Sequence, residues 1–473
     1  MCKMKKKALI IAPHPDDEIN LAGQVIPYFN ENNVDTYVLY ITNGDYSEKI
    51  GNTRILEALK ANKILGIKED RVFFLGYANE WNGTHIYDTN GQVELVSYLG
   101  KTITNGIEGH AEYCYQRFGL HHTFTRDNLK NDLKHFVVEI SADLIICNDF
   151  DSHPDHRATT LIFDEIMGEI ISELDDYHPI VLKKYAYNGV WKGEKDFYSR
   201  PLNGTVLKQP FDYSGGTHEL ESPFFGIENA ICIPAHPSTI TRLITTNIVY
   251  AAAKQHKSTV AWYQMLRVIN SDVIYWKRNT KNLLPKAHVK VSSGNADFLF
   301  DFKLYDSGNV LDRIEPFDKK EYAWRPEAND EKKELQISFK QKSFVKRINI
   351  YSDFDSRHKV KKIYLNLDNR EFLLEFNDDI LKSLILEKPI SVEKIEIRII
   401  EGNDGCGITE IEVLEDETDL SFMEYFRTNE VAKNRSSLFV PISYLEKMYL
   451  DIKFLMLFKI KYEICRRLNK NES

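Results

Sequence analysis

The sequence predicts an α/β fold with a parallel sheet, followed by an all-β sandwich and a helical C-terminal tail. Three observations support this prediction. Apolar runs alternate with helical periodicity in the first part of the chain, polar and apolar residues alternate in later segments, and apolar residues recur every three or four positions near the end. A chain of 473 residues is too long for one hydrophobic core, so we expect two or three domains.

The first part of the chain alternates between strands and helices. Uninterrupted apolar runs predict buried strands at 8–12, 36–42, 72–75, 143–148 and 181–187. Helical periodicity predicts helices at 18–31, 52–65, 127–140 and 155–173. Gly66 follows the second of these helices, where it would serve as a C-cap. This βαβ pattern is typical of a parallel sheet covered by helices.

Residues 78–126 interrupt the pattern with a stretch rich in Gly, Asn, His and Tyr that has no periodicity. An irregular insert of this length in a compact domain is more often functional than not. We expect its four histidines to be mostly ordinary loop residues, although any of them could border a site; they are His85, His110, His121 and His122. Residues 189–235 also read as loops, and helical patterns return over about 238–277.

The pattern changes near residue 285, so we expect a first domain over 1–285 and a second, all-β domain over 290–415. Residues 335–339, 345–351 and 394–400 alternate apolar with polar, which predicts antiparallel strands with one buried and one solvated face.

The tail over 420–473 is predicted to be helical and basic, with Leu445, Met448, Ile452 and Leu455 along one face. Two interpretations stay open. The helix packs on its own chain, which we favour, or it lies on an anionic membrane surface as a peripheral contact.

Composition excludes several classes of protein. A net charge of −9 argues against a general nucleic-acid binder. The six cysteines show no CxxC spacing, which fits a reducing compartment. The apolar run after the basic N-terminus is too short for a signal peptide, and none reaches the roughly 18 residues of a membrane span. We therefore expect a cytoplasmic location, with peripheral association at the inner membrane face left open.

Two short clusters of histidine and acidic residues carry the chemistry. His14-Pro15-Asp16-Asp17-Glu18 follows the first predicted strand, and His153-Pro154-Asp155-His156-Arg157 follows the strand at 143–148. Ligands of parallel sheets bind outside the carboxyl ends of the strands, where both clusters should meet. A His-x-x-Asp loop can place His14 and Asp17 on one metal ion, and a ligand from the second cluster would complete three protein contacts.

Three nitrogen or oxygen ligands with water in a fourth position are typical of a catalytic zinc site. Such an ion lowers the pKa of bound water to about 7 and polarises a carbonyl group. A neighbouring carboxylate can then act as the base, and a second imidazole can stabilise an oxyanion or protonate a leaving amine. The residues thus favour a zinc-dependent hydrolase.

The two clusters resemble the signature motifs of the PIG-L/LmbE-like N-acetylglucosaminyl deacetylases, which are zinc enzymes of Rossmann-like fold. Residues 12–18 and 153–158 carry the resemblance, with supporting matches at 41–45, at Arg54 and at Glu57. It covers roughly residues 5–190.

The resemblance implies a role for each motif residue. It implies zinc ligation by His14, Asp17 and His156, general-base catalysis by Asp16, and stabilisation of the tetrahedral intermediate by His153. It implies that Asp155 orients the second loop and that Arg54 and Asn188 contact the substrate.

The end of the second domain, residues 405–413 together with Trp324, resembles a discoidin-type, galactose-binding-like sandwich of the jelly-roll kind. This resemblance implies a module that binds a glycan or polysaccharide. A sandwich that only supports the catalytic domain or an oligomer interface is an equally open interpretation.

The leading hypothesis is hydrolysis of the N-acetyl group of an N-acetyl-hexosamine in a glycan or glycolipid precursor. Two histidines and one carboxylate are also the ligands of non-haem iron oxygenases, which is the second hypothesis. The third is a carbohydrate-binding protein with a vestigial metal site.

Overall fold

The computed structural model describes most of the chain, including both predicted domains. The described residues are 5–45, 47–79, 81–151, 153–186, 191–192, 206–207, 231–241, 244–259, 269–306, 309–311, 321–377, 379–416, 421–428, 452 and 456. Two described dipeptides pair as a small antiparallel ladder, β6 (Trp191–Lys192) with β7 (Val206–Leu207).

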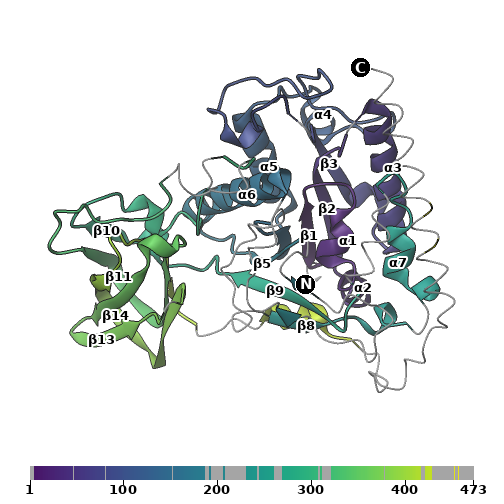
Figure 1. Cartoon of the computed structure of the whole chain (residues 1–473). Coiled ribbons are helices and arrows are strands. Elements are labelled where there is room, and N and C mark those ends of the chain that lie inside the picture. The colour runs from purple at the N-terminus through teal and green to yellow at the C-terminus, as the bar shows by residue number, and fades with distance from the viewer. Residues whose placement is uncertain are drawn as a thin grey trace.

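A seven-stranded sheet forms the centre of the first domain, in the order β3-β2-β1-β4-β5-β9-β8 (Figure 1). Its strands are β1 (Lys7–Ala12), β2 (Asp35–Thr42), β3 (Val72–Tyr77), β4 (Leu144–Asn148), β5 (Ile180–Lys184), β8 (Ile231–Pro234) and β9 (Asp272–Arg278). The first five are parallel, and β9 and β8 extend the sheet with antiparallel pairs. The chain order reverses between β1 and β4, which makes their carboxyl ends the ligand-binding position of a doubly wound sheet.

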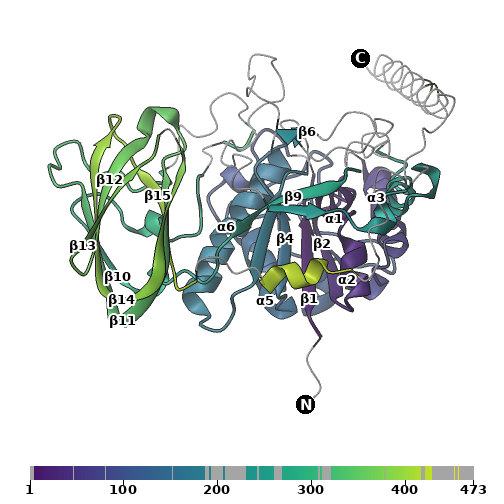
Figure 2. The same ribbon diagram turned by 90° about the horizontal axis from the view of Figure 1, so that it is seen from below.

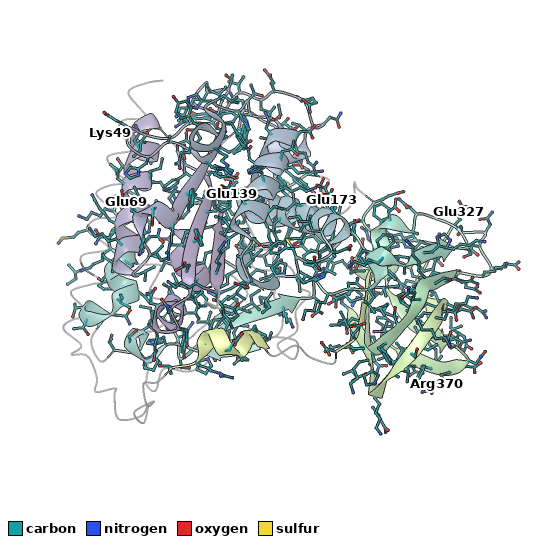
Figure 3. The ribbon with its side chains drawn as sticks, turned by 180° about the vertical axis from the view of Figure 1, so that it is seen from behind. Lys49, Glu69, Glu139, Glu173, Glu327 and Arg370 are labelled. Carbon is teal, nitrogen blue, oxygen red and sulfur yellow. The ribbon has the colours of Figure 1, made fainter. Side chains whose placement is uncertain are left out.

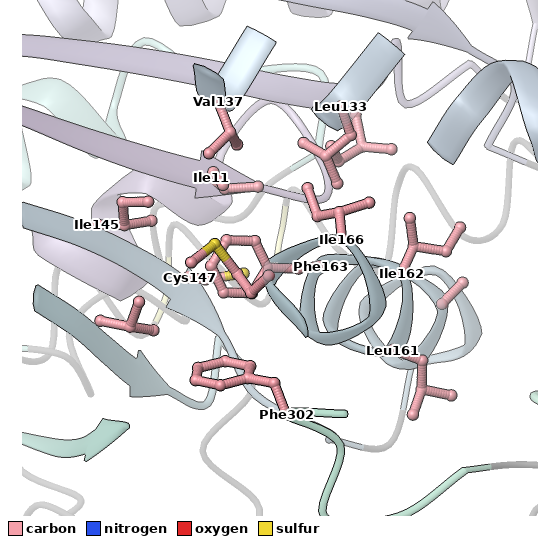
Figure 4. Packing of buried hydrophobic residues seen from close by; sticks show 14 of the residues in the cluster. Ile11, Leu133, Val137, Ile145, Cys147, Leu161, Ile162, Phe163, Ile166 and Phe302 are labelled. Carbon is pink, nitrogen blue, oxygen red and sulfur yellow. The ribbon is translucent and has the colours of Figure 1, made fainter. Parts of the chain in front are cut away.

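Helices cover both faces of this sheet. One face carries α1 (Asp17–Ala22), α2 (Ile26–Glu31), α3 (Glu48–Ile64) and α7 (Ile248–Ala253). The other carries α4 (Tyr113–Phe118), α5 (Arg126–Ile140) and α6 (Pro154–Glu173). β1 is buried on both sides, since Ile10 packs with the first group and Ile11 with the second. Figure 4 shows Ile11 and Cys147 of the sheet facing Phe163 and Ile166 of α6.

The second body is antiparallel and all-β. Its strands are β10 (His288–Val291), β11 (Glu334–Ser352), β12 (Val360–Leu367), β13 (Arg370–Glu375), β14 (Leu381–Gly402) and β15 (Ile408–Leu414). They run in the order β10-β11-β14-β12-β13. β10 pairs with the first part of β11, and β15 pairs with its last part, Arg347–Ser352. Trp324, 0% exposed, lies in their apolar core. The predicted fold class, a parallel α/β domain followed by a β-sandwich, is confirmed.

The sandwich lies beside α6, on the opposite side of the molecule from α3 (Figure 2). In Figure 3, Arg370 lies at the outer end of the sandwich, and Glu173 lies on the side of the first body that is turned toward the sandwich. The chain crosses between the bodies after β9, and Phe302 then returns to the core beneath α6. The predicted boundary at 285–290 stays a prediction.

Two predicted helices differ from the structure. The helix expected at 18–31 is divided into α1 and α2, since the chain turns at Gly23, whose position lies close to Val249 of α7. The helix expected over 238–277 is wrong at its end, because residues 272–278 form β9. Val273, Ile274, Tyr275 and Trp276 are β-branched or aromatic, which favours a strand once β5 offers an edge.

The predicted tail falls largely outside the described residues. Within the described part, residues 421–426 form a short 3-10 helix that packs Phe422 and Phe426 against the first domain. Among the described residues we find no helix with the length and hydropathy needed to cross a membrane.

Candidate metal-dependent active site

Two loops meet where β1 and β4 end. The loop after β1 contributes His14, Asp16 and Asp17, and the loop after β4 contributes Asp151 and the first residues of α6. Because β1 and β4 are adjacent and parallel, both loops leave the same edge of the sheet. The two sequence clusters, about 140 positions apart, are therefore neighbours in the fold, as predicted.

Three side-chain donors form a small triangle at this edge. Nδ1 of His14 lies 3.0 Å from Nε2 of His156. Oδ2 of Asp17 lies 3.1 Å from each of these two nitrogens. Neighbouring ligands of a tetrahedral zinc ion with bonds of about 2.0–2.1 Å stand roughly 3.3 Å apart. The triangle therefore has nearly the dimensions of one face of a zinc coordination shell.

Hydrogen bonds on the outer side of each ring fix which nitrogen carries the proton. Nε2 of His14 lies 3.0 Å from Oδ2 of Asp155, and Nδ1 of His156 lies 2.8 Å from Oδ2 of Asp151. A neutral ring that donates to these carboxylates turns a lone pair toward the triangle. The two nitrogen lone pairs and the Asp17 carboxylate then point at one another with no proton between them. These electron-rich atoms repel one another unless a cation lies between them.

The pKa values of the same groups show how strongly the triangle attracts positive charge. Burial disfavours the charged form of His14, but the carboxylates of Asp155 and Asp17 outweigh it and raise its pKa above the ordinary value. The pKa of His156 rises in the same way beside Asp151 and Asp17. Burial would raise the pKa of Asp17, yet the two imidazoles lower it well below its usual range. The residues present therefore fit a divalent metal ion.

His153 lies next to the triangle but differs from the ligands. Its ring centroid is 4.7 Å from that of His14 and 4.8 Å from that of His156. A donor atom of all three imidazoles lies within 4.8 Å of the others, so geometry alone allows an alternative set of three histidines. Nδ1 of His153, however, accepts the backbone N–H of Asp155 at 3.2 Å. The neutral ring then carries its proton on Nε2, which suits a hydrogen-bond donor and not a metal ligand.

His153 is also held in its neutral form. Burial of the ring lowers its pKa well below the ordinary value. Its side chain is 26% exposed, more than any of the three triangle residues, so it can reach a bound molecule.

Asp16 precedes the triangle residue Asp17 and contacts Arg54. Its Oδ1 accepts a hydrogen bond of 3.0 Å from the Arg54 guanidinium, and its side chain is 13% exposed. Arg54 also donates to the backbone oxygens of Gly44 and Pro15, at 3.1 and 3.4 Å. The side chain of Arg54 is 3% exposed. These contacts make it a residue that positions Asp16, which differs from the substrate contact implied by the sequence resemblance.

Two other predicted residues are placed differently or not at all. Asp155 sits in the second loop, but its carboxylate bridges Nε2 of His14 and Nε2 of His85, at 3.0 and 2.8 Å. It therefore orients a residue of the first loop. Asn188 lies outside the described residues, so its predicted substrate contact stays a prediction.

Sequence reasoning did not assign two partners of the site, Asp151 and His85, although it named His85 among four histidines that could border it. Asp151 holds His156, and its signal was present as a carboxylate two positions before His153. His85 reaches Asp155 from the insert, and nothing in the sequence distinguished it from the other histidines there. A buried pair also lies behind the site, where Nε2 of His256 meets Oε1 of Glu18 at 2.9 Å and ties the start of α1 to the chain after α7.

Comparison with known proteins agrees with the resemblance noted in the sequence. The family model PIG-L, described as GlcNAc-PI de-N-acetylase, matches residues 9–167, which include both loops of the site. No curated protein matches the sequence.

Solved structures resemble each body separately. N,N'-diacetylchitobiose deacetylase from Pyrococcus horikoshii is 18% identical, with a TM-score of 0.25, and the match covers 39% of this chain and 62% of that one. The family 32 carbohydrate-binding module of C. perfringens NanJ, solved with galactose, is 16% identical with a TM-score of 0.21 and matches 27% of this chain and 93% of its own. The family 32 module of Streptococcus pneumoniae EndoD is 14% identical with a TM-score of 0.22, covering 28% and 99% of the two chains.

Proposed function

We propose that this protein is a zinc-dependent hydrolase that removes the acetyl group from an N-acetyl-hexosamine within a glycan or glycolipid precursor. The observation that carries the proposal is the triangle of His14, Asp17 and His156, with the second carboxylate of Asp16 and the neutral imidazole of His153 beside it. The family match over residues 9–167 supports a de-N-acetylase.

The site supplies each group that amide hydrolysis requires. A zinc ion held by His14, Asp17 and His156 would polarise the acetamide carbonyl and lower the pKa of a water molecule to about 7. Asp16 then accepts the proton of the attacking water as a C–O bond forms. Arg54 holds the Asp16 carboxylate in place through its hydrogen bond to Oδ1.

His153 serves the other side of the reaction. Its Nε2–H can donate a hydrogen bond to the oxygen that gains negative charge, because Nδ1 is engaged by the backbone of α6. When the C–N bond breaks, the leaving nitrogen takes up the proton that Asp16 accepted from the water, and the products are acetate and a free amine. His85, Asp155 and Asp151 keep the ligand rings oriented throughout.

The sandwich completes the proposal as a glycan-binding module that holds a polymeric or lipid-linked substrate near the first domain. The family 32 modules similar to it include one solved with galactose. The location remains the cytoplasm in this proposal, and a peripheral membrane contact of the tail stays a prediction.

Acetate release by the zinc-loaded full-length protein from a panel of N-acetylated mono- and oligosaccharides tests the proposal. Release is expected from at least one sugar, and Asp16→Asn should lower kcat by a factor of about 10²–10⁴ while zinc remains bound. The exposed cysteine variant Cys232→Ser is a matched control and should keep full activity.

The same assay separates the alternative chemistry. If the iron-loaded protein consumes oxygen and neither metal form releases acetate, the oxygenase hypothesis is favoured over the hydrolase hypothesis. Equal acetate release by Asp16→Asn and the unaltered protein would remove the proposed base.

A further inference from the structure

A second group of metal-ligand residues lies where the insert packs against α5, away from the two loops of the first site. It comprises Cys114 of α4, His122 in the loop after α4, and Asp132 of α5. One donor atom from each of the three side chains lies within 4.8 Å of the other two. None of these residues belongs to the site described above.

The backbone of the insert brings these residues together. α4 ends at Gly119, whose φ of +73° is the left-handed conformation that glycine adopts most easily. The chain then reverses, and His122 and Thr104 exchange backbone contacts: the N–H of Thr104 donates to the His122 oxygen at 2.8 Å, and the N–H of His122 donates to the Thr104 hydroxyl at 3.0 Å. α5 follows and delivers Asp132, which also accepts the Tyr77 hydroxyl at 2.8 Å.

The cluster holds buried negative charge with little to balance it. Glu112 is 0% exposed and lies beside Cys114, and Asp132 is 2% exposed. Among the described residues, the ion pairs of these two carboxylates are with histidines alone, His121 and His122, and no lysine or arginine joins them. Oε2 of Glu112 is buried and has no hydrogen-bond partner in the described part of the chain. A buried carboxylate oxygen in this state is costly unless a cation or donor satisfies it.

The donor types select the class of cation. A thiol, an imidazole and carboxylates together suit zinc or an ion of similar softness, whereas Ca²⁺ and Mg²⁺ prefer oxygen ligands alone. Sγ of Cys114 lies 3.7 Å from Oε1 of Glu112, the oxygen that Thr104 and His121 also contact, while Oε2 of the same carboxylate is the atom without a partner. Sulfur and oxygen ligands of one tetrahedral zinc ion, with bonds of about 2.3 and 2.1 Å, stand roughly 3.6 Å apart.

We propose that Cys114, His122 and Asp132, with Glu112 beside them, form a second metal site that binds Zn²⁺ and stabilises the insert. The same residue types also occur in cysteine hydrolases, but Cys114 is only 1% exposed and no substrate can reach its sulfur. The ion would link α4 and the following loop to α5. The same insert also presents His85 to Asp155 of the first site.

Cobalt substitution tests the proposal independently of catalysis. The first site has no sulfur ligand, so a thiolate-to-cobalt charge-transfer band in the near ultraviolet reports the second site alone. The metal-free full-length protein titrated with Co²⁺ should develop this band, Cys114→Ser should lack it, and Cys232→Ser should keep it. Absence of the band in the unaltered protein, or its persistence in Cys114→Ser, overturns the proposal.

Zinc content after dialysis against metal-free buffer supplies a second readout. The unaltered protein should retain two equivalents, and Cys114→Ser and His156→Ala should retain one each. His122→Gln, at a half-buried position, covers the case in which Cys114→Ser does not fold, and should weaken zinc binding by a factor on the order of ten or more. If the first site does not bind metal, the cobalt band should still appear. The unaltered protein should then retain only one equivalent of zinc, and His156→Ala should not reduce it. The proposal of a second site would be contradicted if the unaltered protein retained one equivalent of zinc and Cys114→Ser retained the same amount.

Discussion

At the scale of single residues, the direction of each imidazole proton separates metal ligand from catalyst. His14 and His156 donate outward to Asp155 and Asp151 and turn lone pairs inward. His153 accepts a backbone N–H and therefore keeps its proton on the opposite nitrogen. The three rings lie within 5.0 Å of one another, centroid to centroid, so distance alone could not assign these roles.

This assignment predicts opposite effects for two neighbouring substitutions. Asp17→Ala should release the metal of the first site, because it removes one donor of the triangle. His153→Ala should leave the metal content unchanged and lower kcat by a factor of about 10²–10³, because it removes a hydrogen-bond donor to the oxygen that gains negative charge. Metal analysis and acetate release on the same preparations measure both effects. Loss of the metal from His153→Ala, with retention in Asp17→Ala, would favour the three-histidine set.

Arg54 provides a second test at this scale. Its guanidinium contacts Asp16 and two backbone oxygens, so Arg54→Lys should lose the forked geometry while keeping the charge. We expect kcat to fall by a factor on the order of ten with KM nearly unchanged, since a positioning residue acts through the base. A large increase in KM at constant kcat would instead restore the substrate contact that the sequence resemblance implied.

The residues of the site divide into those that sequence could identify and those that it could not. His14, Asp16, Asp17, His153 and His156 lie in two compact motifs, and each motif follows a strand whose burial is evident from its apolar run. The sequence also named Arg54 and His85, but not their partners, Asp16 and Asp155, which lie 38 and 70 positions away. Such contacts depend on how an irregular insert or a helix packs, and no local pattern encodes that packing.

At the scale of elements, strands were predicted better than the helices that cover them. A buried parallel strand is a short apolar run, and the expected strands from 8–12 to 143–148 each correspond to one. The break between α1 and α2 falls instead at Gly23, which lies close to Val249 of α7, a contact between segments more than 200 positions apart. β9 took residues expected to be helical because β5 offered an open edge, which sequence periodicity cannot show.

Two consecutive lysines at the end of β5 lie on opposite faces of the strand and affect the stability of the fold in different ways. Lys183 points toward α6, where Nζ lies 2.7 Å from Oδ1 of Asp164. Lys184 points to the other face and donates to the backbone oxygen of Asn20, and burial lowers its pKa to about 7. The ordinary pKa of lysine is about 10.4, so between about pH 7 and 10.4 the unfolded chain binds a proton at Lys184 that the folded protein does not.

The stability contribution of Lys184 should therefore increase as pH rises from 7 to about 10. Lys184→Met removes this dependence and should raise Tm at pH 7.5, with a difference that shrinks toward pH 10. Lys183→Met is the matched control and should lower Tm, because it leaves Asp164 buried without its cation. Thermal unfolding at several pH values measures both. A constant Tm difference for Lys184→Met across this range would show that burial does not neutralise the lysine.

At the scale of the whole molecule, polar contacts as well as apolar packing join the two bodies. The side chain of Asn282, 6% exposed, donates to the backbone oxygen of Ile411 and accepts the N–H of Val413, both at 2.8 Å. Asn279 donates to Glu412 of the same strand at 2.8 Å. The segment after β9 is therefore fixed along β15, so a glycan bound by the sandwich would have a defined direction relative to the first site.

Asn282→Ala tests whether this junction couples the two bodies. The substitution leaves a buried N–H and a buried carbonyl oxygen without partners, which costs about 1–3 kcal/mol per group. We expect the unaltered protein to unfold in one calorimetric transition and Asn282→Ala to unfold in two, with the sandwich separating from the first domain. Asn279→Ala removes one contact of a partly exposed residue and should have a smaller effect. If Asn282→Ala also lowers kcat on polymeric substrates but not on a monosaccharide, the fixed orientation of the sandwich contributes to catalysis. If the substitution leaves kcat unchanged on both kinds of substrate, the junction contributes to stability alone.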